Sequence, residues 1–233
     1  MGKGKLYLIP TTLADGTVDK LFSESWRASI KQINFFCVEN VRTARRFLGS
    51  LKIYSSIEGL NFSVLDKETS HEQISELLQP LLEGHDIGLI SESGIPAVAD
   101  PGSIAVSFAH RHGLQVCVMP GPSSIIMALA ASGFNGQQFA FHGYLPIDEK
   151  ACAKAIKVLE KESKEKSQTQ IFIETPFRNN RLLKALLKNL SDNSRLCVAI
   201  DLTGSEEKII SKYVRSWPTM ELSKSPAIFL FQG

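Results

Sequence analysis

The sequence lacks most of the short motifs that mark common enzyme classes. It has no P-loop, no G-x-G-x-x-G fingerprint, no G-x-S-x-G elbow and no H-E-x-x-H helix. Kinase-like, NAD-dependent and zinc-peptidase functions therefore lose their main support. No serine, histidine and acid set has a sequence context that suggests a catalytic triad, so a hydrolase is disfavoured as well.

Cysteine is scarce, with only 4 residues in 233, at Cys37, Cys117, Cys152 and Cys197. They lie far apart, and neither a C-x-x-C pair nor a Cys/His spacing typical of zinc ligands occurs. In apolar runs, cysteine behaves as a small hydrophobic residue. We therefore predict core thiols, no disulfides and no metal site.

Long apolar runs and a strong charge of one sign are also missing. The apolar run at residues 6–9 ends at Pro10, without a small-residue cleavage pattern, so we expect neither a signal peptide nor a membrane span. This favours a cytoplasmic protein that does not bind membranes. The formal net charge is only +2, which does not by itself indicate nucleic-acid binding.

What the sequence does contain is an alternation of short apolar runs and helical patterns. Residues 86–146 contain strand, glycine and proline turn, and helix, twice in succession. This order predicts an α/β fold with a mainly parallel sheet. After Pro120 the pattern changes, and the last strands follow one another without helices, which indicates antiparallel pairing in a mixed sheet.

We therefore predict two α/β domains, a mainly parallel one over residues 1–120 and a mixed one over residues 121–233, with a ligand cleft between them. Expected helices include residues 18–30, 70–83 and 179–189. Asn40 is predicted to cap another helix, and Ser70, followed by Gln73, forms a capping-box pattern.

Loops of small residues follow several predicted strands, at residues 10–16, 91–96, 100–102 and 120–124. Small residues let a ligand approach the backbone, and open α/β sheets bind ligands at the carboxyl ends of their strands. Any one of these loops is equally well explained as a tight turn. Together they predict a ligand site.

Several of these segments resemble motifs of one known family. The run S-E-S-G-I-P-A-V-A-D-P-G at 91–102 is similar to S-D-A-G-T-P-x-x-x-D-P-G of the tetrapyrrole methylase superfamily, in the branch of small-subunit ribosomal RNA 2′-O-methyltransferases. L-Y-L-I-P-T-T at 6–12, V-E-N-V-R at 38–42 and M-P-G-P-S-S at 119–124 resemble further motifs of that branch.

The resemblance continues in the second half of the chain. F-H-G-Y-L-P at 141–146 is similar to [YF]-x-G-F-L-P, I-E-T-P-F-R at 173–178 to Y-E-S-P-H-R, and L-T-G-S-E-E at 202–207 to L-T-K-x-x-E. The motifs occur in the order that the family has, nearly from end to end.

The resemblance implies a two-domain α/β fold, a homodimer, and S-adenosylmethionine bound between the domains. The residues that match the family's cofactor-binding positions are Pro10, Ser91, Ser93, Gly94, Ile95, Val98, Ser124, Ile125 and Ala227. We expect contacts mainly through backbone groups at these positions.

Polar residues of the same motifs are expected on the acceptor side, at Glu39, Asp100, Glu174 and Arg178. A helix cap or an ion pair that bridges the two domains is an equally good explanation of each. The three carboxylates, together with His71, are the candidates for a base that would accept a proton from a ribose hydroxyl.

The chain departs from the motifs of the family at Asn40, Glu92, Ser93, Ile95 and Phe177, and in the turn at residues 13–16. The favoured function is S-adenosylmethionine-dependent methylation of ribosomal RNA, at a ribose 2′-oxygen. One alternative is a methyltransferase for a tetrapyrrole or another small molecule. Another is a homodimer that binds S-adenosylmethionine but has lost catalysis, which the departures motivate.

Overall fold

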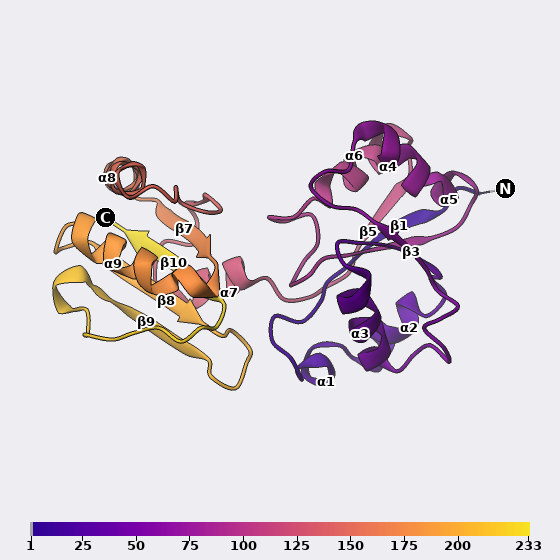
Figure 1. Ribbon diagram of the computed structural model, residues 1–233, viewed down its shortest axis with the longest axis horizontal. Helices are drawn as coiled ribbons and strands as arrows, with labels where there is room; N and C mark the ends of the chain where they lie inside the picture. Colours follow the sequence, from indigo (N-terminus) through magenta and orange to yellow (C-terminus); the bar gives the residue numbers. More distant parts are fainter. Residues whose placement is uncertain (1) are drawn as a thin grey trace. The chain divides into compact units, whose positions relative to one another are not determined.

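The chain folds into two compact units, an N-terminal one that ends at Ser123 and a C-terminal one that begins at Ser124 (Figure 1). The computed structural model describes residues 2–233, without the side chain of His71. Each unit contains one five-stranded sheet with helices on it. The sheet of the N-terminal unit is parallel and the other is mixed, which confirms the predicted fold class.

The N-terminal sheet has the strand order β3-β2-β4-β1-β5, with every neighbouring pair parallel. Its strands are β1 (Lys5–Ile9), β2 (Phe35–Val38), β3 (Asn61–Val64), β4 (Ile87–Ile90) and β5 (Gln115–Val118). The central strand β4 is buried along its whole length, as expected where helices cover both faces of a parallel sheet.

Helices pack on both faces of this sheet (Figure 1). Side chains such as Ile9 and Phe36 point to one face, while Leu8 and Cys37 point to the other, because alternate residues of a strand face opposite sides. The first face carries α2 (Glu24–Ile30) and α3 (Val41–Leu51), and the second carries α4 (His71–Leu77), α5 (Gln79–Leu82) and α6 (Ser103–Arg111).

Two predicted helix starts are confirmed by their capping bonds. The side-chain oxygen of Asn40 accepts the N–H of Arg42 at 2.9 Å. Ser70 and Gln73 form the complete capping box. Because the Asn40 amide oxygen performs this capping, the departure at residue 40 is accommodated within the fold.

Some predicted boundaries are wrong. The expected helix over residues 18–30 is interrupted, because α1 (Val18–Leu21) ends before the buried Phe22, and Ser23 then caps α2. The expected helix over 70–83 divides into α4 and α5, with Pro80 in the first turn of α5. Strand β3 was not predicted: its sequence N-F-S-V alternates polar and apolar residues, but four partly exposed residues are too short a run to indicate a strand securely.

The C-terminal sheet has the strand order β6-β7-β10-β8-β9. Only β6 and β7 are parallel, and the other neighbours are antiparallel, as predicted for the last strands. The strands are β6 (Phe139–Phe141), β7 (Thr169–Glu174), β8 (Arg195–Ile200), β9 (Lys208–Tyr213) and β10 (Ala227–Gln232).

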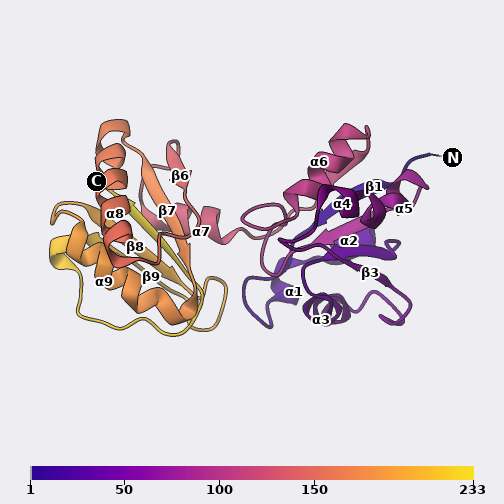
Figure 2. The same cartoon turned by 45° about the horizontal axis from the view of Figure 1, so that its top comes forward.

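One face of this sheet carries the long helix α8 (Glu149–Lys166) and α9 (Asn179–Asn189), as Figure 2 shows. Phe172, Phe229 and Phe231 form the core beneath them, together with Leu182 and Leu186. Helix α7 (Ser124–Ser132) packs against β8, β9 and β10. None of the helices in the described part of the chain is both long and apolar enough to cross a membrane.

A carboxylate on α8 anchors the turn that leads from α9 to β8. One oxygen of Glu160 accepts the backbone N–H of Ser191 at 2.8 Å and the hydroxyls of Ser191 and Ser194. Burial raises the pKa of Glu160, but these hydrogen bonds outweigh burial and hold the pKa below its ordinary value. The ionised form of Glu160 therefore stabilises the C-terminal unit.

Replacing Glu160 by Gln should lower the free energy of unfolding at pH 7 by about 1–3 kcal/mol, because Ser hydroxyls and an N–H lose a charged acceptor. A carboxyl group whose pKa is lower in the folded state stabilises that state at pH values above its unfolded-state pKa. This stabilisation is lost as the pH falls through the folded-state pKa. The difference between wild type and E160Q, measured by urea unfolding, should therefore shrink below about pH 4.

The matched control is E165Q, since Glu165 is exposed on the same helix and, within residues 2–233, its one ion pair is with Lys161 at 3.7 Å. It should change stability by less than about 0.5 kcal/mol. Equal effects of the two substitutions would contradict the anchoring role of Glu160.

Candidate functional site

Three loops converge at the carboxyl edge of the N-terminal sheet, after β1, β4 and β5. They meet at Gly94, whose carbonyl oxygen accepts the N–H of Thr11 at 3.0 Å and the hydroxyl of Ser91 at 3.0 Å. Gly94 has a φ of 73°, a conformation that other residues rarely adopt. The predicted small-residue loops at 10–16 and 91–96 are thus joined directly.

The loop after β5 packs against the same two loops. A Cβ atom at Gly94 would lie 3.1 Å from the carbonyl oxygen of Pro122, and one at Gly121 would lie 2.2 Å from Cγ of Pro10. The second distance is too short for any side chain, so glycine is required at residue 121. The three loops are therefore closely packed on one another, and at the exposed Gly121 no side chain covers the backbone.

Asp100 organises the turn between β4 and α6. Its carboxylate accepts the N–H of Ala97 at 2.8 Å and the N–H of Gly102 at 2.7 Å. Ala97 and Ala99 have φ values of 66° and 63°, which cost energy for a residue with a Cβ atom. Burial raises the pKa of Asp100, while the two backbone N–H groups oppose that rise. The carboxylate thus acts as a cap that holds a strained turn.

Glu39 lies at the same edge, directly after β2, with fewer partners than Asp100. Its carboxylate accepts one N–H, from Glu92, at 3.4 Å. Burial raises its pKa, and the negative charges of Asp100 and Glu92 add to the effect. The side chain of Glu92 in turn accepts the Thr43 hydroxyl. Among the predicted bases, Glu39 combines a raised pKa with a carboxylate that accepts a single long hydrogen bond.

The predicted cofactor-binding residues of this unit differ in what they expose. Pro10, Ser91 and Gly94 are buried, whereas Ser93 and Val98 are exposed and Ile95 is half-buried. Ala97, which the prediction did not include, belongs to the same loop and has the left-handed backbone noted above.

Sequence reasoning also missed Thr11 as a site residue. It is 5% exposed, and its hydroxyl has no hydrogen-bond partner among the described residues. A buried hydroxyl without a partner is costly and is therefore uncommon in folded proteins. Thr11 lies in the motif L-Y-L-I-P-T-T at 6–12, directly after Pro10, so the motif could have indicated it.

The C-terminal unit brings a second group of predicted residues to one edge of its sheet. Glu174 ends β7 and pairs with Ala227 at the start of β10. The guanidinium of Arg178 contacts the Glu174 carboxylate at 2.6 Å, and Glu174 also accepts the N–H of Thr175 at 2.7 Å. Glu174 is only 7% exposed, so this ion pair fixes it in place. Ser124 and Ile125 lie elsewhere in this unit, at the start of α7.

The other predicted base, His71, begins α4, and its side chain lies outside the described part of the structure. With Glu174 fixed by Arg178 and Asp100 fixed by backbone N–H groups, the three carboxylates have different surroundings. Neither alternative considered from sequence describes these contacts: Asp100 accepts N–H groups of the turn before α6 and does not cap that helix, and the Glu174–Arg178 pair lies within the C-terminal unit.

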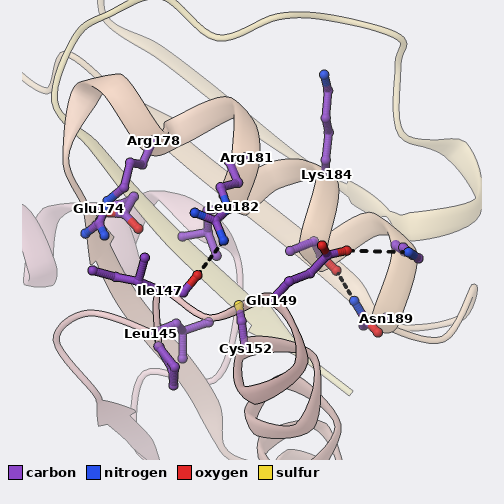
Figure 3. Close-up of a pocket in the computed structure, with 13 residues that line it drawn as sticks. Leu145, Ile147, Glu149, Cys152, Glu174, Arg178, Arg181, Leu182, Lys184 and Asn189 are labelled. Atoms are coloured by element: carbon purple, nitrogen blue, oxygen red, sulfur yellow. Dashed lines mark hydrogen bonds and ion pairs between the residues drawn. The ribbon is translucent and has the colours of Figure 1, made fainter.

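A pocket of about 410 Å³ lies in the C-terminal unit (Figure 3). It lies between the start of α8, the side of α9 and the loop at 145–147, and Glu174 and Arg178 form one end of its lining. Sequence reasoning did not find it. The signal available was the spacing of Arg181, Lys184 and Lys188, which fall on one side of a helix.

Comparison with known families identifies the chain. The sequence profile of the family described as Tetrapyrrole (Corrin/Porphyrin) Methylases matches residues 36–215. The chain therefore belongs to the tetrapyrrole methylase family, which confirms the resemblance read from its motifs and the predicted class of enzyme, a methyltransferase.

Relatives with assigned names lie within this family. The chain is 26% identical over 228 residues to "Ribosomal RNA small subunit methyltransferase I" of Thermotoga maritima, which covers 94% of this chain and 96% of that protein. It is 30% identical over 208 residues to the protein of the same name from Halalkalibacterium halodurans, covering 89% of this chain and 68% of that protein.

Solved structures share the fold. The methyltransferase CobJ aligns with a TM-score of 0.63 at 17% identity, over 100% of this chain and 95% of that one. Uroporphyrin-III-C-methyltransferase from Thermus thermophilus aligns with a TM-score of 0.56 at 17% identity, over 98% of this chain and 92% of that one. At these identities the comparison supports the fold and not the substrate.

Replacing Glu39 by Gln should stabilise the protein at pH 7. Since the folded state raises the pKa of Glu39, wild type gains stability as the pH falls through that pKa and carries the cost of a charged, partly buried carboxylate above it. The unfolding temperature of E39Q should exceed that of wild type at pH 7, and the advantage should disappear near pH 4. A destabilised E39Q at pH 7 would show that Glu39 is a structural residue.

Replacing Asp100 by Ala should lower the free energy of unfolding by about 1–3 kcal/mol, because the N–H groups of Ala97 and Gly102 lose their acceptor. D100N keeps one side-chain oxygen and should recover part of the loss. Urea unfolding of both variants measures this. Equal stability of D100A and wild type would contradict the capping role.

Proposed function

We propose that this protein is an S-adenosylmethionine-dependent methyltransferase that methylates small-subunit ribosomal RNA at a ribose 2′-oxygen. The observation that carries the proposal is the similarity along nearly the whole length of both chains to the Thermotoga maritima relative with the ribosomal RNA name. The raised pKa of Glu39 at the loop edge supports it, because a ribose hydroxyl benefits from a base.

The residues at the loop edge fit S-adenosylmethionine. The Thr11 hydroxyl is buried and has no hydrogen-bond partner among the described residues, and the exposed Gly121 presents backbone at a position where no Cβ atom fits. We propose that Pro10, Ser91, Ser93, Gly94, Ile95 and Val98 contribute to this site. We further propose that Ser124, Ile125 and Ala227 of the C-terminal unit complete it, as the family resemblance implies.

When bound, S-adenosylmethionine supplies a methyl group on a sulfonium, which departs as a neutral thioether. The protein therefore needs no acid to assist the leaving group. Glu39 would accept the proton of the 2′-hydroxyl as the oxygen forms its bond to the methyl carbon. Asp100 would hold the turn that shapes the site, and the Glu174–Arg178 pair would position the acceptor. Correct alignment of acceptor and methyl group alone is worth up to about 7–11 kcal/mol.

We also propose that the protein is a homodimer in the cytoplasm, as the family resemblance and the sequence suggested. Sedimentation equilibrium of the purified chain decides between a dimer and a monomer. A mass equal to one chain at all concentrations would overturn the dimer.

Calorimetric titration should show S-adenosylmethionine binding at one site per chain. Small ribosomal subunits that lack the modification should then accept labelled methyl groups, recovered after nuclease digestion as a 2′-O-methyl nucleoside. E39Q should bind S-adenosylmethionine within about twofold of wild type but lower kcat by about 10²–10⁴-fold, because it loses the base. E83Q, which changes an exposed carboxylate before the start of β4 and away from the loop edge, should leave kcat unchanged.

The alternatives have distinct outcomes. A protein that binds S-adenosylmethionine but transfers no methyl group to RNA, and transfers it to a tetrapyrrole, is the small-molecule enzyme. One that binds the donor and modifies no acceptor is the lapsed form. No binding at millimolar donor would contradict the methyltransferase itself.

A further inference from the structure

The pocket between α8 and α9 has an apolar floor. Leu145, Cys152 and Leu182 lie at its base, and each is less than 10% exposed. Figure 3 shows the basic side chains of α9 above this floor, with Glu149 of α8 at the other side. Its volume of about 410 Å³ lies in the range of about 300–1,000 Å³ that small-molecule sites occupy.

The lining of the pocket has an excess of positive charge. It contains Arg178, Arg181, Lys184 and Lys188, but only two carboxylates, Glu149 and Glu174. The Arg178–Glu174 pair is short, at 2.6 Å, and both of its side chains are largely buried. The Lys188–Glu149 pair is longer, at 3.7 Å, with both side chains more than three-quarters exposed, so it holds Lys188 weakly.

The remaining cations are available to a ligand. Arg181 donates one N–H to the carbonyl oxygen of Ile147, which orients its guanidinium toward the pocket and leaves other donors unused. Lys184 is exposed and has no ion-pair partner among the described residues. Arg181, Lys184 and Lys188 follow one another at intervals of three and four residues, so they form one row on α9.

An exposed aromatic ring lies next to this row in the sequence. Phe177 is 83% exposed, more than any other large apolar residue among those the structure describes, and directly precedes Arg178. The ammonium of Lys224 lies 6.0 Å from its ring centroid. Exposed aromatic rings accompanied by cations are typical of surfaces that stack the bases of single-stranded nucleic acids.

We propose that this pocket is a subsite for one nucleotide of single-stranded RNA, with its phosphate on Arg181, Lys184 and Lys188 and its base or ribose on the apolar floor. Phe177 then stacks a neighbouring base. A phosphate suits the row of cations, and a planar apolar group suits the floor. The inference rests on the proposed RNA acceptor, and it adds a binding site outside the loop edge.

The test measures binding of a fluorescent single-stranded oligoribonucleotide by anisotropy at several salt concentrations. K184E and R181E should each weaken binding by about tenfold or more, and should reduce the slope of log affinity against log salt by about 0.7 for each phosphate that the variant no longer neutralises. A185W fills the pocket without changing charge, and should weaken binding with an unchanged salt slope. F177A should weaken binding by removing a stacked base.

The control is K161E, which reverses a charge on α8 outside the pocket, where Lys161 makes only an exposed pair with Glu165. It should bind RNA within about twofold of wild type. Each variant is also checked for its unfolding temperature and for S-adenosylmethionine binding, neither of which the pocket should affect. A variant with a lowered unfolding temperature and lost S-adenosylmethionine binding is misfolded, and the comparison then uses the remaining pocket variants.

Two failures are distinguishable. If wild type binds RNA and methylates small subunits while K184E, R181E and A185W bind RNA as wild type does, the pocket inference is overturned and the proposed function stands. If wild type binds S-adenosylmethionine but neither binds nor methylates RNA, the RNA acceptor is wrong and the subsite is overturned with it.

Discussion

Parallel pairing of the N-terminal strands is the constraint on which the candidate site depends. Because β1, β2, β4 and β5 run in one direction, the loops that follow them emerge at one edge of the sheet. The carbonyl oxygen of Gly94 then joins two of these loops through Thr11 and Ser91, and the contact of Gly121 with Pro10 brings in the third. Neither glycine tolerates a side chain without movement of its neighbours, so the close packing of the three loops depends on both.

Two partly buried carboxylates, Glu160 and Glu39, have opposite pKa shifts and opposite effects on stability. Glu160 is buried to a similar degree as Glu39, yet hydrogen bonds from Ser191 and Ser194 hold its pKa low, so its charge stabilises the fold. Glu39 has one long hydrogen bond and two carboxylates nearby, so its pKa is raised and its charge costs stability. Carboxylates with a raised pKa cluster at functional sites, since a general base is most effective when its pKa lies near the working pH. The fold tolerates the cost because apolar clusters pack both faces of the sheet beneath it.

Much of this architecture could be predicted from sequence, for identifiable reasons. Helix α9 was predicted over its observed residues, and Asn40 and Ser70 were predicted as caps, because capping depends on local chemistry. Strand β3 was not predicted, because the alternation in its four partly exposed residues is too short to be distinctive and its pairing with β2 is a contact between distant residues. At the site, motifs located the loops, but the difference between Asp100 as a turn cap and Glu39 as a raised carboxylate depends on contacts between distant residues. The α9 pocket was invisible for the same reason, since its floor and its cations come from separate segments.

The most direct test of the account is a pH titration of the Glu39 carboxyl carbon by NMR, in protein labelled at glutamate and assigned by comparison with E39Q. We predict a midpoint above the ordinary glutamate value of about 4.3. The signal should also move when S-adenosylhomocysteine is added, because the product occupies the loop edge beside it. A midpoint at or below the ordinary value would contradict the role of Glu39 as a base with a raised pKa. No response to the product would contradict the placement of the S-adenosylmethionine site at the loop edge.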